Sequence, residues 1–130
     1  MRPVALLLLS LASPALGQSG GSLMGCPATG ADLLALTQGQ PMGCACWQPG
    51  SGPVWGTDLY AAESAICAAA LHAGVIARPT GGPVRVVPAP GQARYTGSAR
   101  NGIVSADRGA SAQSFRFERN TDRYGVPPGR

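Results

Sequence analysis

A cysteine and a histidine lie five positions apart in the segment SAICAAALHAGVI, residues 64–76. Such a pair could be a thiol nucleophile with its base, or two ligands of a zinc ion. The alanines around the pair favour a helix, on which residues five apart point about 140° away from each other, so His72 cannot easily reach Cys67. Zinc needs four ligands, and the chain has a single histidine. Both chemistries are therefore disfavoured, and neither a metal site nor a catalytic residue is expected.

The four cysteines, Cys26, Cys44, Cys46 and Cys67, all follow a predicted export signal. An even number of cysteines in a short exported chain predicts two disulfides, and three pairings are open. The Cys-Ala-Cys pair could also be combined with Cys26, Cys67 or His72 as a metal set, which four free thiols in the exported protein would support. Because export favours oxidation, the disulfides are preferred, and no cofactor is expected.

A serine hydrolase is a further alternative, because Ser64 or Ser98 could be combined with His72 and Asp58 as a catalytic triad. Nothing in the sequence resembles a nucleophile elbow, the strained turn that presents such a serine. A small hydrolase or a redox protein is therefore the least favoured interpretation, and we expect a protein that is not an enzyme.

Positive charge is carried by arginine alone and concentrates in the second half of the chain. Residues 18–77 have three acidic side chains and no basic one, whereas residues 78–130 have nine arginines against three acidic side chains. Guanidinium groups bind carboxylates and phosphates bidentately, so this half favours contact with anionic groups. Scattered solvated charge is the plainer explanation, and Arg100 could instead bind carbonyls of the neighbouring turn. The candidate anion-binding residues are Arg85, Arg94, Arg100 and Arg108.

The few aromatic residues could form a platform on which a sugar stacks. We expect Trp55 and Tyr60 in the core instead, and Trp47, in a turn-rich stretch, to be exposed. Nucleic acid is not expected as a partner, because the chain carries an export signal, has few aromatics and lacks a recognition motif.

These side chains need elements to hold them, and the clearest is a central helix at about Ser64–Ala73. Ser64 is placed to be its N-cap, and Gly74 suits the position that ends a helix. An apolar stripe runs along this helix and predicts one buried face, through Ile66, Cys67, Ala70 and Leu71.

Short β-prone runs flank the helix and predict antiparallel strands. In residues 83–87, Val84 and Val86 alternate with Arg85, and Pro88 and Pro90 are expected to end the strand. The pair Asn101-Gly102 predicts a type I′ hairpin. Further runs occupy residues 54–57, 95–98, 103–105 and 114–117, whereas the run 33–36 could be a helical turn or a strand. The predicted fold class is α+β, a central helix packed by antiparallel strands.

The chain divides into four segments. Residues 1–17, MRPVALLLLSLASPALG, have the basic start, apolar run and small-residue exit of a secretory signal peptide. Residues 18–25 look like a flexible lead-in, residues 26–117 form the domain, and residues 118–130 form a polar tail that we expect to be disordered. No segment is apolar over the length that a transmembrane helix requires, so we expect a secreted or periplasmic protein.

Four motifs follow in a recognisable order: VWGTDLYAAESAICAAALHAGVI, GGPVRVV, GQARYTGSARNGIVS and SFRF. The sequence resembles an LCCL domain, here in a bacterial-type, secreted, single-domain form. The resemblance implies a central helix wrapped by antiparallel β-structure in an extracellular setting. It also implies that the cysteines pair first with second and third with fourth, as Cys26–Cys44 and Cys46–Cys67.

The resemblance implies no catalytic mechanism. It implies a non-enzymatic interaction module, for which lipopolysaccharide or other microbial or matrix surfaces are proposed ligands. The expected partners are an anionic glycan, a lipopolysaccharide-like glycolipid, or an extracellular or envelope protein. The alternative is a structural module within an envelope assembly.

Overall fold

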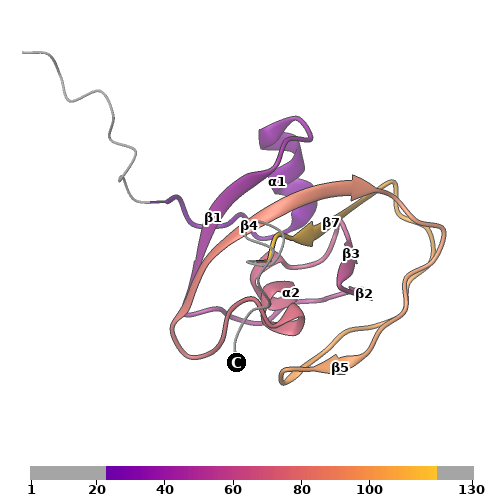
Figure 1. Cartoon of the computed structure of the whole chain (residues 1–130). Helices are drawn as coiled ribbons and strands as arrows, with labels where there is room; N and C mark the ends of the chain where they lie inside the picture. Colours follow the sequence, from indigo (N-terminus) through magenta and orange to yellow (C-terminus); the bar gives the residue numbers. More distant parts are fainter. Residues whose placement is uncertain (1–22, 120–130) are drawn as a thin grey trace, which may run out of the picture.

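The computed structural model describes residues 23–119, and five of its strands form one antiparallel sheet (Figure 1). The spatial order of these strands is β1-β4-β7-β3-β2, so strands distant in sequence are neighbours. Their bounds are β1 Met42–Trp47, β2 Gly56–Thr57, β3 Leu59–Ala61, β4 Gly81–Pro90 and β7 Gln113–Phe117. Together with two helices they confirm the predicted α+β class.

The central helix is α2, Ile66–Ala73, which begins later than expected. Ser64 is not its N-cap: Ala65 holds that position, and the Ser64 hydroxyl accepts a hydrogen bond from the backbone N–H of Trp55 at 3.0 Å. The helix ends at Gly74, whose φ of 79° is left-handed, as the C-terminal glycine signal predicts. Every residue of α2 except Cys67 is buried, so the sheet and loops enclose it on all sides rather than on one stripe.

Alanine is what permits this enclosure. Ala68, Ala69 and Ala70 occupy consecutive helical positions and are all buried. A methyl side chain lets neighbouring backbone approach the helix closely, and a larger one would overpack the interior. Tyr60, Phe115 and Phe117 form an aromatic cluster in the core, with ring centroids 5.6 to 6.0 Å apart.

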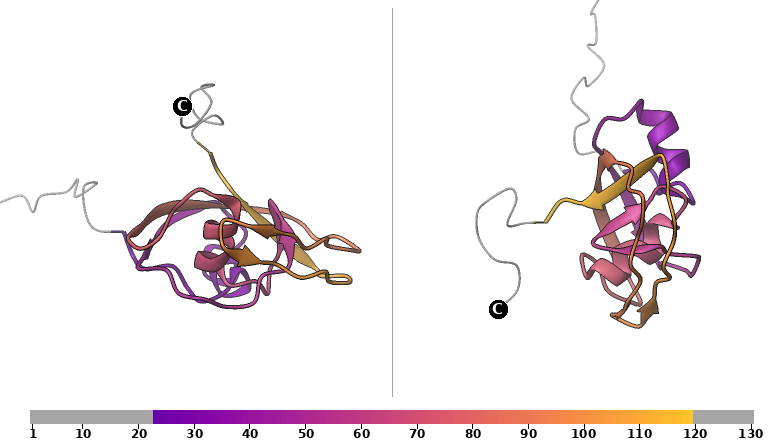
Figure 2. Two further views of the ribbon diagram at one scale, coloured as in Figure 1. Left: turned by 90° about the horizontal axis from the view of Figure 1, so that it is seen from below. Right: turned by 90° about the vertical axis from the view of Figure 1, so that its right-hand side faces the viewer.

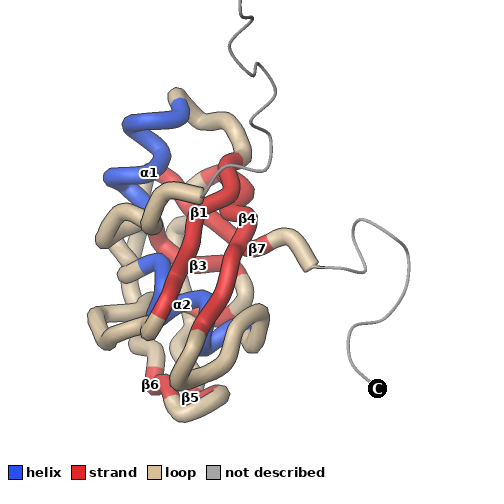
Figure 3. Tube along the Cα trace, turned by 90° about the vertical axis from the view of Figure 1, so that its left-hand side faces the viewer, coloured by secondary structure: helices blue, strands red, loops and turns tan. Residues whose placement is uncertain are grey.

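The apolar run at residues 33–36, left open by its sequence, lies in helix α1, Gly30–Thr37. Thr29 caps it by accepting a hydrogen bond from the backbone N–H of Asp32 at 3.2 Å. Gly30 lies against the ring of Phe115, where a Cβ would overlap ring carbons, so this glycine lets α1 sit directly on β7. The helix lies at the end of the molecule opposite the β5–β6 hairpin (Figure 3).

Strand β4 does not stop at Val87 as expected but continues through Pro88 to Pro90. Beyond Val86, which pairs with the first residue of β1, only β7 accompanies β4. A proline is tolerated where one edge of a strand has no partner to receive an N–H. The alternation is as predicted, with Val84 and Val86 buried and Arg85 exposed.

The predicted hairpin is present as β5, Ala99–Arg100, and β6, Ile103–Val104. Both residues of the Asn101-Gly102 turn have positive φ, 53° and 77°, as a type I′ turn requires. The amide of Asn101 donates to the carbonyl oxygen of His72 at 2.9 Å and fastens the hairpin to the end of α2. Views from the front and from below place the hairpin on one flank of α2 and, on the opposite flank, the end of the sheet where β1 finishes and β4 begins (Figures 1 and 2).

Ordered contacts reach past both edges of residues 26–117. Met24 accepts a hydrogen bond from the backbone N–H of Ala45, and the N–H of Glu118 donates to the carbonyl of Arg85, both at 2.9 Å. The predicted signal peptide and residues 120–130 of the predicted tail lie outside the described residues.

Candidate binding cleft and charged surface

Two disulfides fasten the N-terminal segment and helix α2 to strand β1. They pair Cys26 with Cys44 and Cys46 with Cys67, and each closes a loop, with sequence separations of 18 and 21. Cys44 and Cys46 are two positions apart on β1 and therefore point to the same face, where one bridge ties the N-terminal segment and the other ties α2. This pairing confirms the one implied by the family resemblance.

The cysteines are also the one group in residues 23–119 with the spacing of a metal site. The sulfurs of Cys26, Cys46 and Cys67 lie within 4.8 Å of one another. All three belong to disulfides, and a disulfide sulfur lacks the thiolate charge with which cysteine binds a metal.

His72 is fully buried and takes part in a chain of hydrogen bonds. Of the two serines considered for a triad, Ser98 has its hydroxyl oxygen 3.2 Å from Nε2 of His72, whereas Nδ1 lies beside Tyr60 and the Asp58 carboxylate pairs with Arg100. Nε2 of His72 lies 3.0 Å from the carbonyl oxygen of Ser98, which can only accept, so Nε2 carries the proton in the neutral ring. Nδ1 then accepts from the hydroxyl of Tyr60, 2.9 Å away. Burial raises the pKa of Tyr60 to about 12, and the negative charge of Asp58 acts in the same direction. The chain links β3, α2 and the residue before the hairpin, so Ser98 belongs to it, whereas no hydrogen bond joins Cys67 or Ser64 to it within residues 23–119.

Three of the four candidate anion-binding arginines have carboxylate partners. Arg85 pairs with Glu118 at 2.9 Å, Arg100 with Asp58 at 2.9 Å and Arg108 with Glu63 at 3.3 Å. The Asp58 carboxylate raises the pKa of Arg100 above its usual value through a hydrogen bond and its charge.

Arg94 differs from these three, since it is exposed and makes no ion pair or hydrogen bond within residues 23–119. Arg108 also covers the ring of Trp55, with its guanidinium carbon 5.2 Å from the ring centroid, which leaves Trp55 half-buried rather than fully in the core.

A cleft opens where strands β1 and β4 come apart. Trp47, the last residue of β1, pairs with Gly81, the first of β4, and its side chain is 60% exposed, as its turn-rich setting predicted. Cys46 points into the core toward Cys67, so its neighbour Trp47 points outward by the alternation of a strand. The cleft has a volume of about 540 Å³, and its lining residues are Trp47, Gln48, Pro49, Arg78, Pro79 and Thr80.

Backbone contacts fix the shape of this cleft. The N–H of Gln48 donates to the carbonyl of Thr80 at 2.8 Å and joins its two walls. At Gly81 a Cβ would overlap the carbonyl oxygen of Cys46, so only glycine allows the walls to approach this closely.

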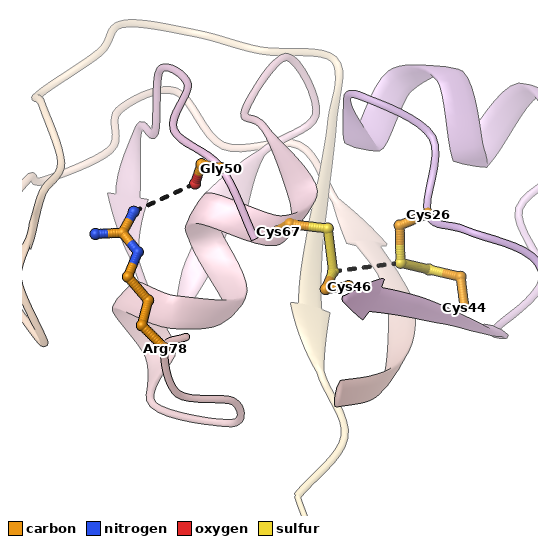
Figure 4. The surroundings of a disulfide bond; sticks show 6 residues. All are labelled: Cys26, Cys44, Cys46, Gly50, Cys67 and Arg78. Carbon is orange, nitrogen blue, oxygen red and sulfur yellow. Dashed lines mark hydrogen bonds between the residues drawn. A yellow bond between two sulfur atoms is a disulfide. The ribbon is translucent and has the colours of Figure 1, made fainter. Parts of the chain in front are cut away.

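Arg78 supplies the positive charge of the cleft. Its guanidinium reaches across to the carbonyl oxygen of Gly50 at 3.4 Å (Figure 4). Residues 23–119 provide no carboxylate partner for it, in contrast to Arg85, Arg100 and Arg108. Sequence inspection did not select Arg78, because 30 intervening residues separate it from Trp47 and only the pairing of β1 with β4 brings the two together.

The fold and the site together define a class: a small α+β domain held by two disulfides, with a solvent-facing tryptophan in a basic cleft. Within residues 23–119, no helix has the length and apolar character needed to cross a membrane. The chain belongs to the LCCL domain family, whose model matches residues 34–115.

Curated relatives are extracellular proteins of animals. The chain is 49% identical over 65 residues to human "Cysteine-rich secretory protein LCCL domain-containing 2", covering 50% of this chain and 13% of that protein. It is 39% identical over 93 residues to "Clotting factor C" of Tachypleus tridentatus, covering 68% of this chain and 9% of that protein. Human "Cochlin" is 50% identical over 52 residues, covering 40% and 9%. The chain thus spans only about a tenth of the length of these relatives, and the match supports an interaction module.

Proposed function

We propose that this protein is an exported, non-enzymatic module that binds an anionic glycan or a lipopolysaccharide-like glycolipid through the cleft between Trp47 and Arg78. Residues 1–17 act as its signal peptide, residues 26–117 form a bacterial-type single domain, and the product is secreted or periplasmic. The observation that carries the proposal is an exposed indole beside an arginine that has no carboxylate partner within residues 23–119.

The chemistry of the cleft suits an acidic sugar. The C–H face of a sugar ring packs on an indole, which is amphipathic and rigid and so loses little entropy on binding. A guanidinium beside it can take a carboxylate or phosphate in two parallel hydrogen bonds. A volume of about 540 Å³ lies within the range of small-molecule sites and would hold one or a few sugar rings.

The partners of the other arginines support this choice of surface. An anion approaching Arg85, Arg100 or Arg108 would have to compete with a carboxylate already in place, so these three favour a structural role. Arg94 has no such competitor within residues 23–119 and remains a candidate for a second contact with an extended ligand.

Titration of the secreted protein with a uronic-acid oligosaccharide and with lipopolysaccharide vesicles tests the proposal, with uncharged dextran fragments as the comparison. Trp47→Ala should weaken binding of the acidic ligand about tenfold, or about 1.4 kcal/mol, through loss of stacking. Arg78→Gln should reduce the preference for acidic over neutral ligand by a similar factor and remove most of the salt dependence.

Arg85→Gln is the matched control, because it also deletes one exposed arginine but one that is already paired with Glu118. Its affinity for the acidic ligand should stay within about twofold of the unaltered protein. Equal losses in Arg78→Gln and Arg85→Gln would show that net charge rather than the cleft governs binding. Absence of binding to either acidic ligand would refute the proposal and leave a structural module within an envelope assembly as the alternative.

A further inference from the structure

The two disulfides are not independent of each other in space. The sulfur of Cys46 lies 3.5 Å from the sulfur of Cys26 in the other bridge, and Figure 4 shows the two facing each other. Neither atom carries a proton while both bridges are intact, so this is a nonbonded contact at the edge of van der Waals distance. A thiolate on Cys26 or Cys46 would therefore be in contact with a sulfur of the other bridge, which is the distance that thiol–disulfide exchange requires.

Burial separates the four cysteine residues into two kinds. Cys44 and Cys46 on β1 are 0% and 2% exposed, whereas Cys26 and Cys67 are partly exposed. A reductant from solvent therefore reaches Cys67 rather than Cys46 in the second bridge. Since attack on one sulfur of a bridge releases the other as a thiolate, the group released is Cys46, the one that touches Cys26.

We propose that Cys26 and Cys46 form an exchange pair, in which a thiolate on either sulfur attacks the other and creates a Cys26–Cys46 bridge. This activity is separate from ligand binding at the cleft. It makes the module sensitive to a dithiol reductant and turns Cys67 of α2 into a thiol that a partner can reach.

The steps balance with one dithiol reductant. Its first thiolate attacks the sulfur of Cys67, breaks the Cys46–Cys67 bond and leaves the electron pair on Cys46. The Cys46 thiolate then attacks Cys26, forms the Cys26–Cys46 bond and releases Cys44 as a thiolate. The second thiolate of the reductant then attacks the reductant's own sulfur in the mixed disulfide, which releases Cys67 as a thiolate and the reductant as an intramolecular disulfide. One dithiol is oxidised, and the protein keeps one bridge and gains thiols at Cys44 and Cys67.

A pair of variants isolates the geometry, because both remove the same bridge. Cys44→Ser leaves a free thiol at Cys26, whose sulfur is in contact with that of Cys46. Cys26→Ser instead leaves a free thiol at Cys44, whose sulfur does not belong to the group of Cys26, Cys46 and Cys67 sulfurs that lie within 4.8 Å of one another. We would purify both oxidised, hold them at about pH 8 to form thiolate, quench with acid and map the bridges by peptide mass spectrometry.

The expected result is asymmetric. Cys44→Ser should contain a Cys26–Cys46 bridge with a free Cys67 in at least about a tenth of its molecules, whereas Cys26→Ser should keep Cys46–Cys67 alone. Only Cys46–Cys67 in both variants would overturn the proposal. Circular dichroism identifies unfolding, since a chain that has lost its structure would scramble its bridges alike in the two variants, and that result would also count against the exchange pair.

The unaltered protein provides a measurement that needs no substitution. Treatment with a limiting amount of dithiothreitol, followed by acid quench, should yield a one-bridge species containing Cys26–Cys46 with thiols at Cys44 and Cys67. One-bridge species that retain only the two original pairings would contradict the proposal, whatever the behaviour of the variants.

Discussion

The two flanks of α2 use polar side chains in opposite ways. At the hairpin flank, Arg100 is paired with Asp58, Asn101 with the end of the helix, and His72 with Tyr60 and Ser98. At the cleft flank, an indole faces solvent, and the one hydrogen bond of Arg78 within residues 23–119 goes to a backbone carbonyl that any residue could supply. Groups that satisfy one another hold a fold together, whereas groups left toward solvent are available to a ligand.

The comparison teaches that a count of arginines is a poor guide to a binding surface. The second half of the chain is rich in arginine, yet three of the four arginines selected from its sequence already have carboxylates beside them. The flanks should therefore respond differently to substitution, the hairpin flank in stability and the cleft flank in binding.

The largest effect should come from His72→Ala. It leaves a cavity and deprives the buried Tyr60 hydroxyl of its acceptor, whereas the Ser98 carbonyl keeps the N–H and hydroxyl of Ser105 as donors, so the free energy of unfolding should fall by about 3–5 kcal/mol, mainly through the cavity. Urea denaturation measures this fall, and a His72→Gln variant, which retains hydrogen-bonding groups, should lose less. If the folded His72→Ala protein lost ligand affinity at the cleft as well, the separation of the two flanks would fail.

A smaller effect should appear at alkaline pH. Folding raises the pKa of the Tyr60 hydroxyl to about 12 by burial, above the value of about 10 in an unfolded chain. A raised pKa here means that the fold favours the neutral phenol, so its contribution is complete below about pH 10 and is lost as the pH rises toward 12. Denaturation midpoints measured from pH 9 to 12 should show this decline.

The Tyr60→Phe variant is the control for that decline. It should be less stable below about pH 10, because His72 Nδ1 loses its donor, but it should lack the part of the decline that belongs to this hydroxyl, so the two stability curves approach each other toward pH 12. Tyrosinate absorbance would contradict the assignment if all tyrosines of the folded protein ionised together near pH 10.

The smallest expected effect is a difference in thermal midpoint between the Arg100→Gln and Arg78→Gln variants. Arg100→Gln removes an exposed ion pair with Asp58 and should lower the thermal midpoint by about 1–4 °C at low salt, with the difference fading at high salt. Arg78→Gln should leave the midpoint unchanged within error. The reverse order in a thermal melt would mean that Arg78 is structural and Arg100 the more available cation.

The sequence was informative wherever a local signal was strong. Gly74 ends α2, the Asn-Gly pair makes the hairpin, and Val84 and Val86 face the core, because each depends on nearest neighbours. The disulfide pairing came from family resemblance, since residue spacing alone left three pairings open.

Long-range contacts account for what the sequence did not reveal. Ser64 is the right residue type for an N-cap, but its hydroxyl serves the backbone of Trp55 instead. Pro88 lies inside a strand because β1 does not extend beside it, so that edge of β4 has no partner strand that needs its N–H. The cleft depends on Trp47 and Arg78 meeting through strand pairing, which no short motif encodes.

The arrangement of the bridges along β1 has a mechanical consequence. A pull applied between Cys26 and the end of β7 would pass through both bridges and bypass the loops they close, with sequence separations of 18 and 21. Only the chain after Cys67 could then lengthen, by about 3.3–3.6 Å per residue. In a single-molecule stretching trace the oxidised module would therefore extend only a short way. Reduction would add the extended lengths of the two loops that the bridges close.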